Sequence, residues 1–395
     1  MRSIFLAPLV ACSSLLGAAQ PPGTDSSVAT VVWKAVQGTD FTGDIRQVML
    51  DTATRDAYLA TRTTLYRVKG DKVDTVAKQP DKTAELILAP GGAILAWLLP
   101  QPQARGLLQA RVLDLTGREV GLLRLQESPH GFGALYLGFQ ERLVVTASPL
   151  DDRDGMNGRF QYTFWSSDGK ERSKVVFPEQ QDVVLDRLGQ AVLFLAPGFL
   201  APDGAKAVAH DPSGTRLWEL PGSFRRAVLA AEGRLALLNP APPGDIRDVW
   251  IFRGSGRATV VKAPTPVQHL RVAPDLASAL VVGNDGTYSY LDPARGVLTE
   301  AHALLPGTSF RITDADFVGP DKVAFGVRQN TGTPDHPRWS QAALVAVDRG
   351  GKVIFREELK SGEGSGSYPR IEVEAGGAAF IGYTAEHAVL VSFGQ

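Results

Sequence analysis

Two pairs of carboxylates, each pair separated by a single residue, are the side chains in this sequence best suited to chemistry. Asp314 and Asp316 form the first pair, and Glu372 and Glu374 form the second. Side chains two positions apart lie on the same face of a β-strand, so each pair would present two carboxylates in one direction. Paired carboxylates can perform glycoside hydrolysis or lyase chemistry. The alternative is a hydrated channel with charged inner strand edges, which also deter edge-to-edge pairing.

Metal-ligand patterns are weaker. The segment DDRDGMNG, residues 151–158, offers Asp152 and Asp154 at the alternate spacing that Ca²⁺ loops use, but Met156 stands where a third oxygen should be and no glutamate closes the loop. We therefore predict a polar hairpin tip there. The six histidines include no His-x-His or His-x-x-x-His pair, so we predict no metal site; they are His130, His210, His269, His302, His336 and His387. Neither a Gly-x-Ser-x-Gly motif nor a glycine-rich phosphate loop occurs.

The elements that would position these residues are short strands joined by turns. LQARVLDLTGREVGLLRL (residues 108–125) and AVAHDPSGTRLWELPG (residues 207–222) each read as strand, tight turn, strand. The turn aspartate can accept hydrogen bonds from amides two residues on, and the glycine supplies positive φ. Long stretches with apolar residues at helical spacing are absent from the sequence, which predicts an all-β chain.

The strands fall into groups of four. Seven groups begin near Ile45, Ala84, Gly133, Asp182, Arg226, His269 and Arg311. Their spacing is near the roughly 40–50 residues of a propeller blade. An eighth group has only three strands before the chain ends, and VATVVWKAV (residues 28–36) is available to complete it. We therefore predict an eight-bladed β-propeller closed by this N-terminal strand, with seven blades as the alternative.

The segment AHDPSGTRLWELPG resembles the blade ending Asp-x-x-Thr-Gly-x-x-x-Trp of quinoprotein-type repeats, with Ser213 in place of threonine. The chain is thus similar, at the level of architecture, to exported bacterial β-propellers with quinoprotein-type or Trp-Asp-like repeats. A quinone-dependent dehydrogenase of that kind would show adjacent cysteines and a calcium cluster, neither of which this sequence contains. We therefore predict no cofactor. The resemblance in fold does not imply one, because propellers carry many unrelated functions.

The N-terminus has the pattern of an export signal. Arg2 precedes an apolar run, and small residues end at Ala19, which predicts a signal peptide over residues 1–19, a linker over 20–27 and one propeller domain over 28–395. LVAC, ending at Cys12, resembles the lipobox of bacterial lipoproteins and predicts, as the alternative, a signal ending before a lipidated Cys12. We expect an exported protein that is periplasmic, a cell-envelope lipoprotein or secreted, and that meets a membrane only through such an anchor.

Charge narrows the partners. The chain has 41 basic and 42 acidic residues, a net charge of -1, and so no basic excess to neutralise phosphates. Nucleic acid is excluded as an expected partner on this ground. Hydrophobic residues make up 44% of the chain, which is enough for a large core.

Turn lengths then indicate a working face. Turns from first to second and from third to fourth strand are tight, whereas several second-to-third loops are long, especially in groups two to five and seven. Long loops on a rigid scaffold commonly bind ligands. We predict a non-enzymatic module or scaffold that binds a protein, small molecule or glycan on this long-loop face; a carbohydrate-active hydrolase or lyase is the alternative. The predicted anchors are Asp152, Asp154, Phe199, Arg247, Arg338 and Trp339. Neutral loop insertions would produce the same length pattern.

Overall fold

A computed structural model describes residues 29–51, 54, 56–78, 85–88, 94–100, 108–124, 138–140, 143–150, 158–166, 170–196, 204–306, 310–330, 338–360, 368–374 and 377–393. The chain divides into two compact units. Unit 1 comprises Met1–Leu59, Tyr66–Asp74 and Gly307–Gln395, and unit 2 comprises Ala60–Leu65 and Thr75–Pro306.

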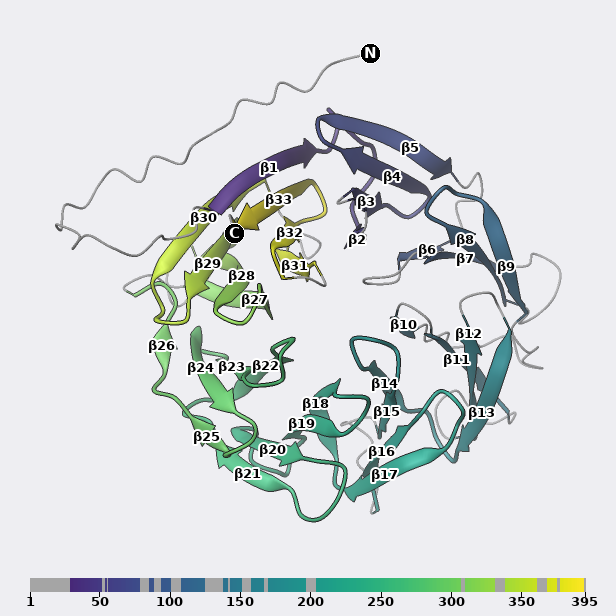
Figure 1. The fold of residues 1–395 in the computed structure, drawn as a ribbon, viewed down its shortest axis with the longest axis vertical. Coiled ribbons are helices and arrows are strands. Elements are labelled where there is room, and N and C mark those ends of the chain that lie inside the picture. The colour runs from purple at the N-terminus through teal and green to yellow at the C-terminus, as the bar shows by residue number, and fades with distance from the viewer. Residues whose placement is uncertain are drawn as a thin grey trace. The chain divides into compact units, whose positions relative to one another are not determined.

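Unit 1 holds most of three antiparallel sheets (Figure 1). The first contains β27 (Phe310–Phe317), β28 (Lys322–Asn330), β29 (Trp339–Asp348) and β30 (Val353–Leu359). The second contains β31 (Arg370–Val373), β32 (Ala379–Tyr383), β33 (His387–Phe393) and β1 (Ala29–Val36). The third contains β2 (Gln47–Leu50), β3 (Ala57–Ala60), β4 (Thr64–Lys69) and β5 (Lys72–Lys78).

Unit 2 holds five sheets with the same consecutive strand order. Their strands are β6 (Glu85–Leu88), β7 (Ile94–Pro100), β8 (Leu108–Asp114), β9 (Glu119–Arg124); β10 (Gly138–Gln140), β11 (Leu143–Pro149), β12 (Phe160–Ser166), β13 (Glu171–Phe177); β14 (Asp182–Leu185), β15 (Val192–Leu195), β16 (Lys206–His210), β17 (Arg216–Pro221); β18 (Phe224–Ala230), β19 (Leu235–Pro240), β20 (Asp248–Phe252), β21 (Thr259–Lys262); and β22 (Val267–Val272), β23 (Ala279–Gly283), β24 (Thr287–Asp292), β25 (Val297–Leu298) and β26 (His302–Ala303).

The all-β prediction is confirmed for the residues that the structure describes, which contain strands and turns but no helix. Each predicted group begins close to the first strand of a sheet. One difference lies in the sheet of β22–β26, where the predicted fourth strand is split in two: β25 and β26 both pair with β24. The interruption follows Thr299, whose hydroxyl accepts a hydrogen bond from the amide of Tyr290 at 2.9 Å.

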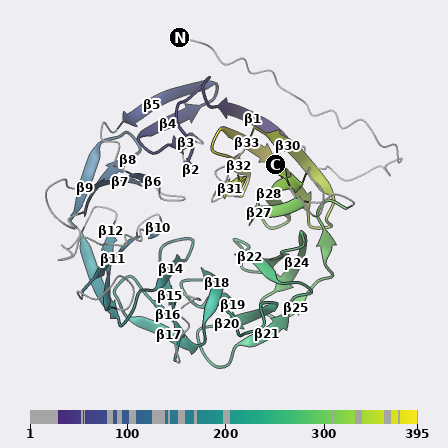
Figure 2. The ribbon, with the colours of Figure 1, turned by 180° about the vertical axis from the view of Figure 1, so that it is seen from behind.

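The first and last described strands pair in one sheet, as the surplus N-terminal strand predicted. β1 pairs antiparallel with β33 over seven residue pairs, from Ala29 opposite Phe393 to Val36 opposite His387. Figures 1 and 2 show the purple β1 beside the yellow β33 from both sides. Without β1, β33 would present an unpaired edge.

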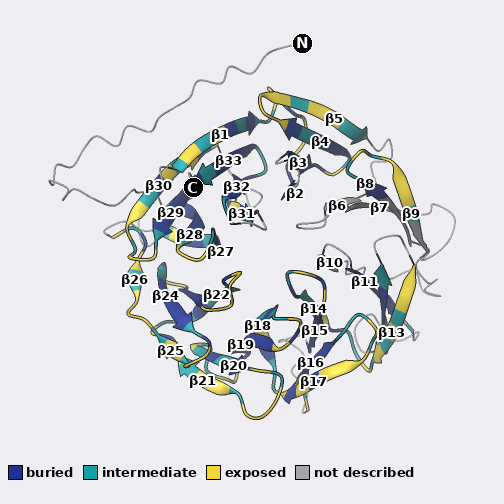
Figure 3. Cartoon of the chain, in the orientation of Figure 1, coloured by how far each residue is buried: buried dark blue, intermediate teal, exposed yellow. Residues whose placement is uncertain are grey.

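The core of each unit lies between neighbouring sheets. In unit 1, Trp33 and Ala35 of β1 join buried side chains from β2, β3, β4, β32 and β33 in a single cluster. In unit 2, the fourth strands carry much of the exposed surface: β17 and β21 are largely exposed whereas β15 is buried along its whole length (Figure 3). Sheets buried on both faces explain why most strands read as continuous apolar runs.

The tight turns have the predicted chemistry. Asp114 accepts a hydrogen bond from the amide of Thr116 at 2.9 Å, and Asp211 accepts one from Ser213 at 2.9 Å. Gly117 and Gly214, which close these turns, both have φ of +83°. A side chain at that φ would be strained, so the Asp–Gly punctuation in the sequence is a backbone requirement of the hairpins.

The Trp33→Ala variant should lower the free energy of unfolding by ~3–5 kcal/mol, because it removes a large buried side chain from β1, the strand that pairs with β33. Trp33 is 4% exposed, and its neighbour Val32 is 36% exposed at a bulge. Denaturant melts of Trp33→Ala and of the control Val32→Ala test this. Equal stability of the two variants would contradict the role assigned to β1.

Candidate functional site

The four candidate carboxylates lie in unit 1, where Asp314 joins two sheets. Asp314 and Asp316 stand opposite Gly326 and Ala324 in β28, so they share a face of β27. One oxygen of each carboxylate accepts a hydrogen bond from the next residue's amide, at 2.9 and 2.8 Å. The second oxygen of Asp314 accepts from the amide of Ile371 in β31 at 3.0 Å. Asp314 of β27 therefore links its sheet to β31, the first strand of the next sheet along the chain.

The second pair occupies a different setting. Glu372 lies in β31 opposite Ile381, and Glu374 is buried just beyond the end of the strand. Near Glu372, burial raises the pKa of Tyr383 to about 12, with Arg370 opposing the shift and Glu372 and Asp314 adding to it. Tyr383 therefore stays protonated at neutral pH and can act as a hydrogen-bond donor but not as a base.

The other predicted site residues lie partly inside and partly outside the described residues. Groups of three or more metal-ligating side chains are absent from the part of the chain that the structure describes. Cys12, Asp152, Asp154 and Phe199 lie outside the described residues. Arg247, Arg338 and Trp339 are described: Arg247 directly precedes β20, Arg338 directly precedes β29, and Trp339 begins β29.

Arg247 belongs to a loop of unit 2 that is held from beneath by a buried amide. The side-chain nitrogen of Asn239 donates to the carbonyl oxygens of Ile246 and Asp248 at 2.9 and 2.8 Å. Its side-chain oxygen accepts from Nε of Arg225 at 2.6 Å, and Arg225 also donates to the carbonyl of Val267 in β22 at 2.6 Å. These bonds fix the backbone that carries Arg247 to two neighbouring sheets.

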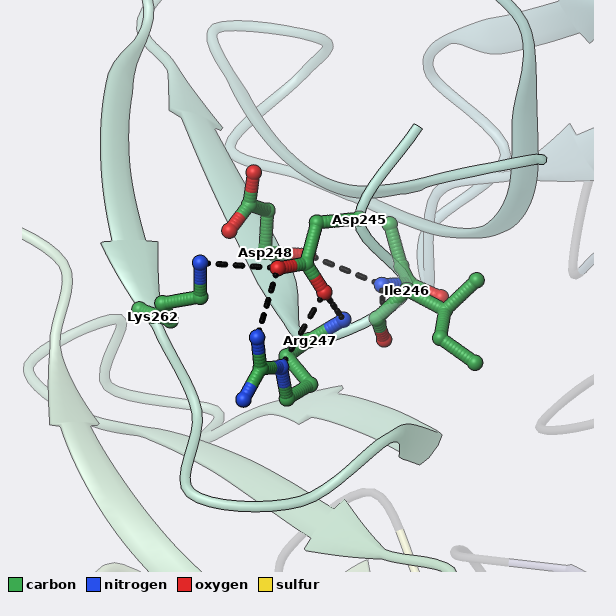
Figure 4. Close-up of polar contacts among 6 residues, drawn as sticks. Asp245, Ile246, Arg247, Asp248 and Lys262 are labelled. Atoms are coloured by element: carbon green, nitrogen blue, oxygen red, sulfur yellow. Dashed lines mark hydrogen bonds and ion pairs between the residues drawn. The ribbon is translucent and has the colours of Figure 1, made fainter. Parts of the chain in front are cut away.

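At the surface, Arg247 is paired with Asp245 (Figure 4). The Asp245 carboxylate accepts from Nε and Nη2 of Arg247 at 3.2 and 3.0 Å, and Lys262 contacts it at 2.7 Å. Arg247 first and Lys262 second hold the pKa of Asp245 well below its usual range. Because the three side chains are solvated, the pairs contribute little stability. Arg247 is therefore oriented by Asp245, an i–2 neighbour visible in the sequence, and Asp245 is also paired with Lys262, a contact that the sequence does not show.

Trp339 begins β29 in unit 1 and stacks beneath an arginine. The guanidinium carbon of Arg311, in β27, lies 5.2 Å from the centre of the Trp339 ring, a cation–π contact. Asn330 stands opposite Trp339 and accepts a hydrogen bond from the amide of Arg338 at 2.9 Å. The predicted anchors Arg338 and Trp339 are thus placed by β27 and β28.

A second cation–π contact lies on the same face. Arg328 of β28 stands directly opposite Arg311, and its guanidinium carbon lies 5.1 Å from the ring centre of Tyr368. Arg328 is only 4% exposed, and its buried Nε has no hydrogen-bond partner among the described residues, whereas Tyr368 is 37% exposed. We name Arg311, Arg328, Trp339 and Tyr368 the Arg–aromatic cluster. Sequence inspection found only Trp339, because the four residues come from separate segments.

The backbone next to Tyr368, just before β31, is held by contacts with β27 and β28. Thr313 donates to the carbonyl of Pro369 at 2.6 Å. Gly326 permits the approach: a Cβ there would lie 2.7 Å from the Pro369 oxygen, closer than side-chain atoms tolerate. The Arg–aromatic cluster is therefore ordered by contacts of the backbone around it.

A buried histidine holds the end of β30. Nδ1 of His387 accepts from the amide of Lys360 at 3.0 Å, and Thr384 donates to the Lys360 carbonyl at 2.8 Å. His387 is 5% exposed, and burial, with smaller effects from Lys34 and Lys360, lowers its pKa from 6.5 to about 4. An accepting Nδ1 places the proton of the neutral ring on Nε2.

His387 should make stability fall on acidification. Its folded pKa, about 4, lies below the unfolded 6.5, so the unfolded state takes up the proton first and stability declines from pH 6.5 to 4. The full contribution is on the order of 3 kcal/mol. Denaturant melts at pH 7, 5.5 and 4 should show a shallower decline for His387→Gln than for the wild type. Parallel pH profiles of the two proteins would refute this role of His387.

Comparison with known proteins shows the fold. No family model and no curated protein matches this chain. It is similar to the C-terminal WD40 domain of Sif2, with a TM-score of 0.60 and 10% identity over 93% of this chain and 99% of that one. BamB from Moraxella catarrhalis is similar with a TM-score of 0.54 and 12% identity, over 93% and 100% of the two chains.

The β-propeller domain of Cps50 (Swd1) from Myceliophteria thermophila is a further similar structure. Its TM-score is 0.50 at 13% identity, over 91% of this chain and 99% of that one. WD40 domains are β-propellers, so these likenesses show that the chain has a β-propeller fold. Within the described residues, no helix has the length and apolar character needed to cross a membrane.

Proposed function

We propose that this chain is a binding module without enzymatic activity, whose partner docks at the end of the unit 1 sheets that carries the Arg–aromatic cluster. The observation that carries the proposal is the pair of cation–π contacts, Arg311 on Trp339 and Arg328 on Tyr368. Tryptophan, tyrosine and arginine are the side chains that dominate binding energy at protein interfaces. Their order before binding reduces the entropy lost on association.

A protein is the partner class that this chemistry favours. Small-molecule sites are concave and lined mainly by apolar groups, whereas the Arg–aromatic cluster includes the exposed Arg311 and Tyr368. The carboxylate pairs support an enzyme less well, since both oxygens of Asp314 accept backbone hydrogen bonds. The Asp245–Arg247–Lys262 surface in unit 2 is a second candidate contact, because its backbone is also held in place.

We further propose that residues 28–395 form one eight-bladed propeller. Two observations support this: the described residues form eight antiparallel sheets, and β1 completes the sheet of the last three strands. A shared sheet of this kind joins the first and last blades of a propeller and removes two free edges. The count of seven blades would leave one sheet without a place in the ring.

Replacing Arg338 and Trp339 together with alanine should weaken partner capture about tenfold or more, as expected for loss of an interface anchor. The measurement is a quantitative pull-down from the native envelope fraction. Arg349→Ala, in the exposed turn between β29 and β30 at the opposite end of the same sheet, is the control. A partner profile that survives the double variant but is lost in Arg349→Ala would place binding on the other face.

We also propose that residues 1–19 direct export, with Cys12 deciding between a lipid anchor and free secretion. The basis is the sequence pattern of Arg2, the apolar run and LVAC. If Cys12 is lipidated, Cys12→Ala should move the protein from the membrane fraction to the soluble fraction while its melting temperature is unchanged. A wild-type protein that is already soluble after fractionation would exclude the anchor.

A further inference from the structure

We propose that Arg311 and Arg328 bind a carboxylate from an acidic segment of the partner protein, a role that rests on the proposed binding function. The two guanidinium groups come from residues that stand directly opposite each other on β27 and β28. Directly opposed like charges destabilise a sheet. An anion bound between them would remove that repulsion.

Arg328 carries a charge that is buried and incompletely hydrogen-bonded among the described residues. Arg328 is 4% exposed, and its Nε has no hydrogen-bond partner in the described part of the chain. A buried charge is costly unless it is paired and hydrogen-bonded. Tyr368 supplies a ring face to Arg328, but a ring face accepts no conventional hydrogen bond from Nε. A carboxylate oxygen would supply Nε of Arg328 with the charged acceptor that the described residues do not provide.

Several other arginines of the described residues are paired with a carboxylate. Arg67 pairs with the buried Asp56, Arg216 pairs with Glu219, and Arg247 pairs with Asp245. Arg311 and Arg328 instead lie against the two aromatic rings, and Nε of Arg328 has no hydrogen-bond partner among the described residues. On the same face of β27, Asp314 has both oxygens in backbone hydrogen bonds to Ala315 and Ile371.

The surroundings favour a peptide over a free anion. A guanidinium forms parallel hydrogen bonds with the two oxygens of a carboxylate. Trp339 is half-buried and Tyr368 is 37% exposed, so both rings offer apolar surface beside the charge. An acidic residue followed by an apolar side chain would use both features, whereas inorganic phosphate would use only the charge.

The test measures binding of two fluorescein-labelled peptides to the full chain by anisotropy. One peptide alternates Glu with Leu, and the other replaces every Glu with Gln. We expect the wild type to bind the Glu peptide and to lose about tenfold in affinity for it through Arg311→Gln, with partial recovery in Arg311→Lys. Arg311 is exposed, so these variants should fold. Arg257→Gln, which removes an exposed positive charge from unit 2, should leave affinity unchanged.

Three results would overturn the inference: equal binding of the Glu and Gln peptides, equal losses in Arg311→Gln and Arg257→Gln, or displacement of the Glu peptide by equimolar inorganic phosphate. The last result would assign the pair to a free anion. If the inference fails while the Arg338 and Trp339 double variant still loses its partner, the binding function stands and only the acidic chemistry is wrong. If the double variant also retains its partner, the proposed function fails as well.

Discussion

Every β-sheet ends in strands whose outward amide and carbonyl groups need hydrogen-bond partners, and this constraint governs how the described residues are used. β1 meets this need for β33: it pairs with β33 and so covers the edge that the last three strands would otherwise leave unpaired. The same strand brings Trp33 into the core shared with β2–β4, so edge protection and core packing depend on one segment. Removing it would expose backbone and apolar surface together.

Polar side chains also provide hydrogen-bond partners for backbone groups of a neighbouring sheet. Asp314 accepts a hydrogen bond from the amide of Ile371, and Thr313 donates to the carbonyl of Pro369. In unit 2, Trp218 donates to the carbonyl of Gly233 at 2.6 Å, which gives a physical role to the tryptophan of the repeat-like segment. Asp314 and Asp316, whose types and spacing suggested chemistry in the sequence, thus accept hydrogen bonds from neighbouring backbone amides. Such bonds have value here because unpaired buried amides and carbonyls are costly.

The side chains of the proposed binding surface lie where strands end. Turns such as Asp114–Gly117 are closed by their own aspartate and glycine and project little beyond the sheet. The loop that carries Arg247 is longer and needs Asn239 beneath it, and the Arg–aromatic cluster needs Pro369 packed against Gly326. Rigid support for exposed arginine and aromatic side chains is what the proposed binding surface requires.

The sequence by itself determined the strand and turn pattern, including the Asp–Gly hairpins and the N-terminal strand that completes the last sheet. These features are local: alternating or continuous apolar runs, turn residues at fixed offsets, and a surplus strand matched by a deficit. Sequence also placed Arg247, Arg338 and Trp339 at the start of third strands, because loop length can be counted along the chain. Only the tertiary structure decided that Arg311 opposes Arg328, that Tyr368 covers Arg328 and that Asp314 serves Ile371. These residues lie up to about sixty positions apart, and their contact depends on strand register, on the bulge between Ile312 and Asp314 and on sheet-to-sheet packing, none of which has a signature in the residues themselves.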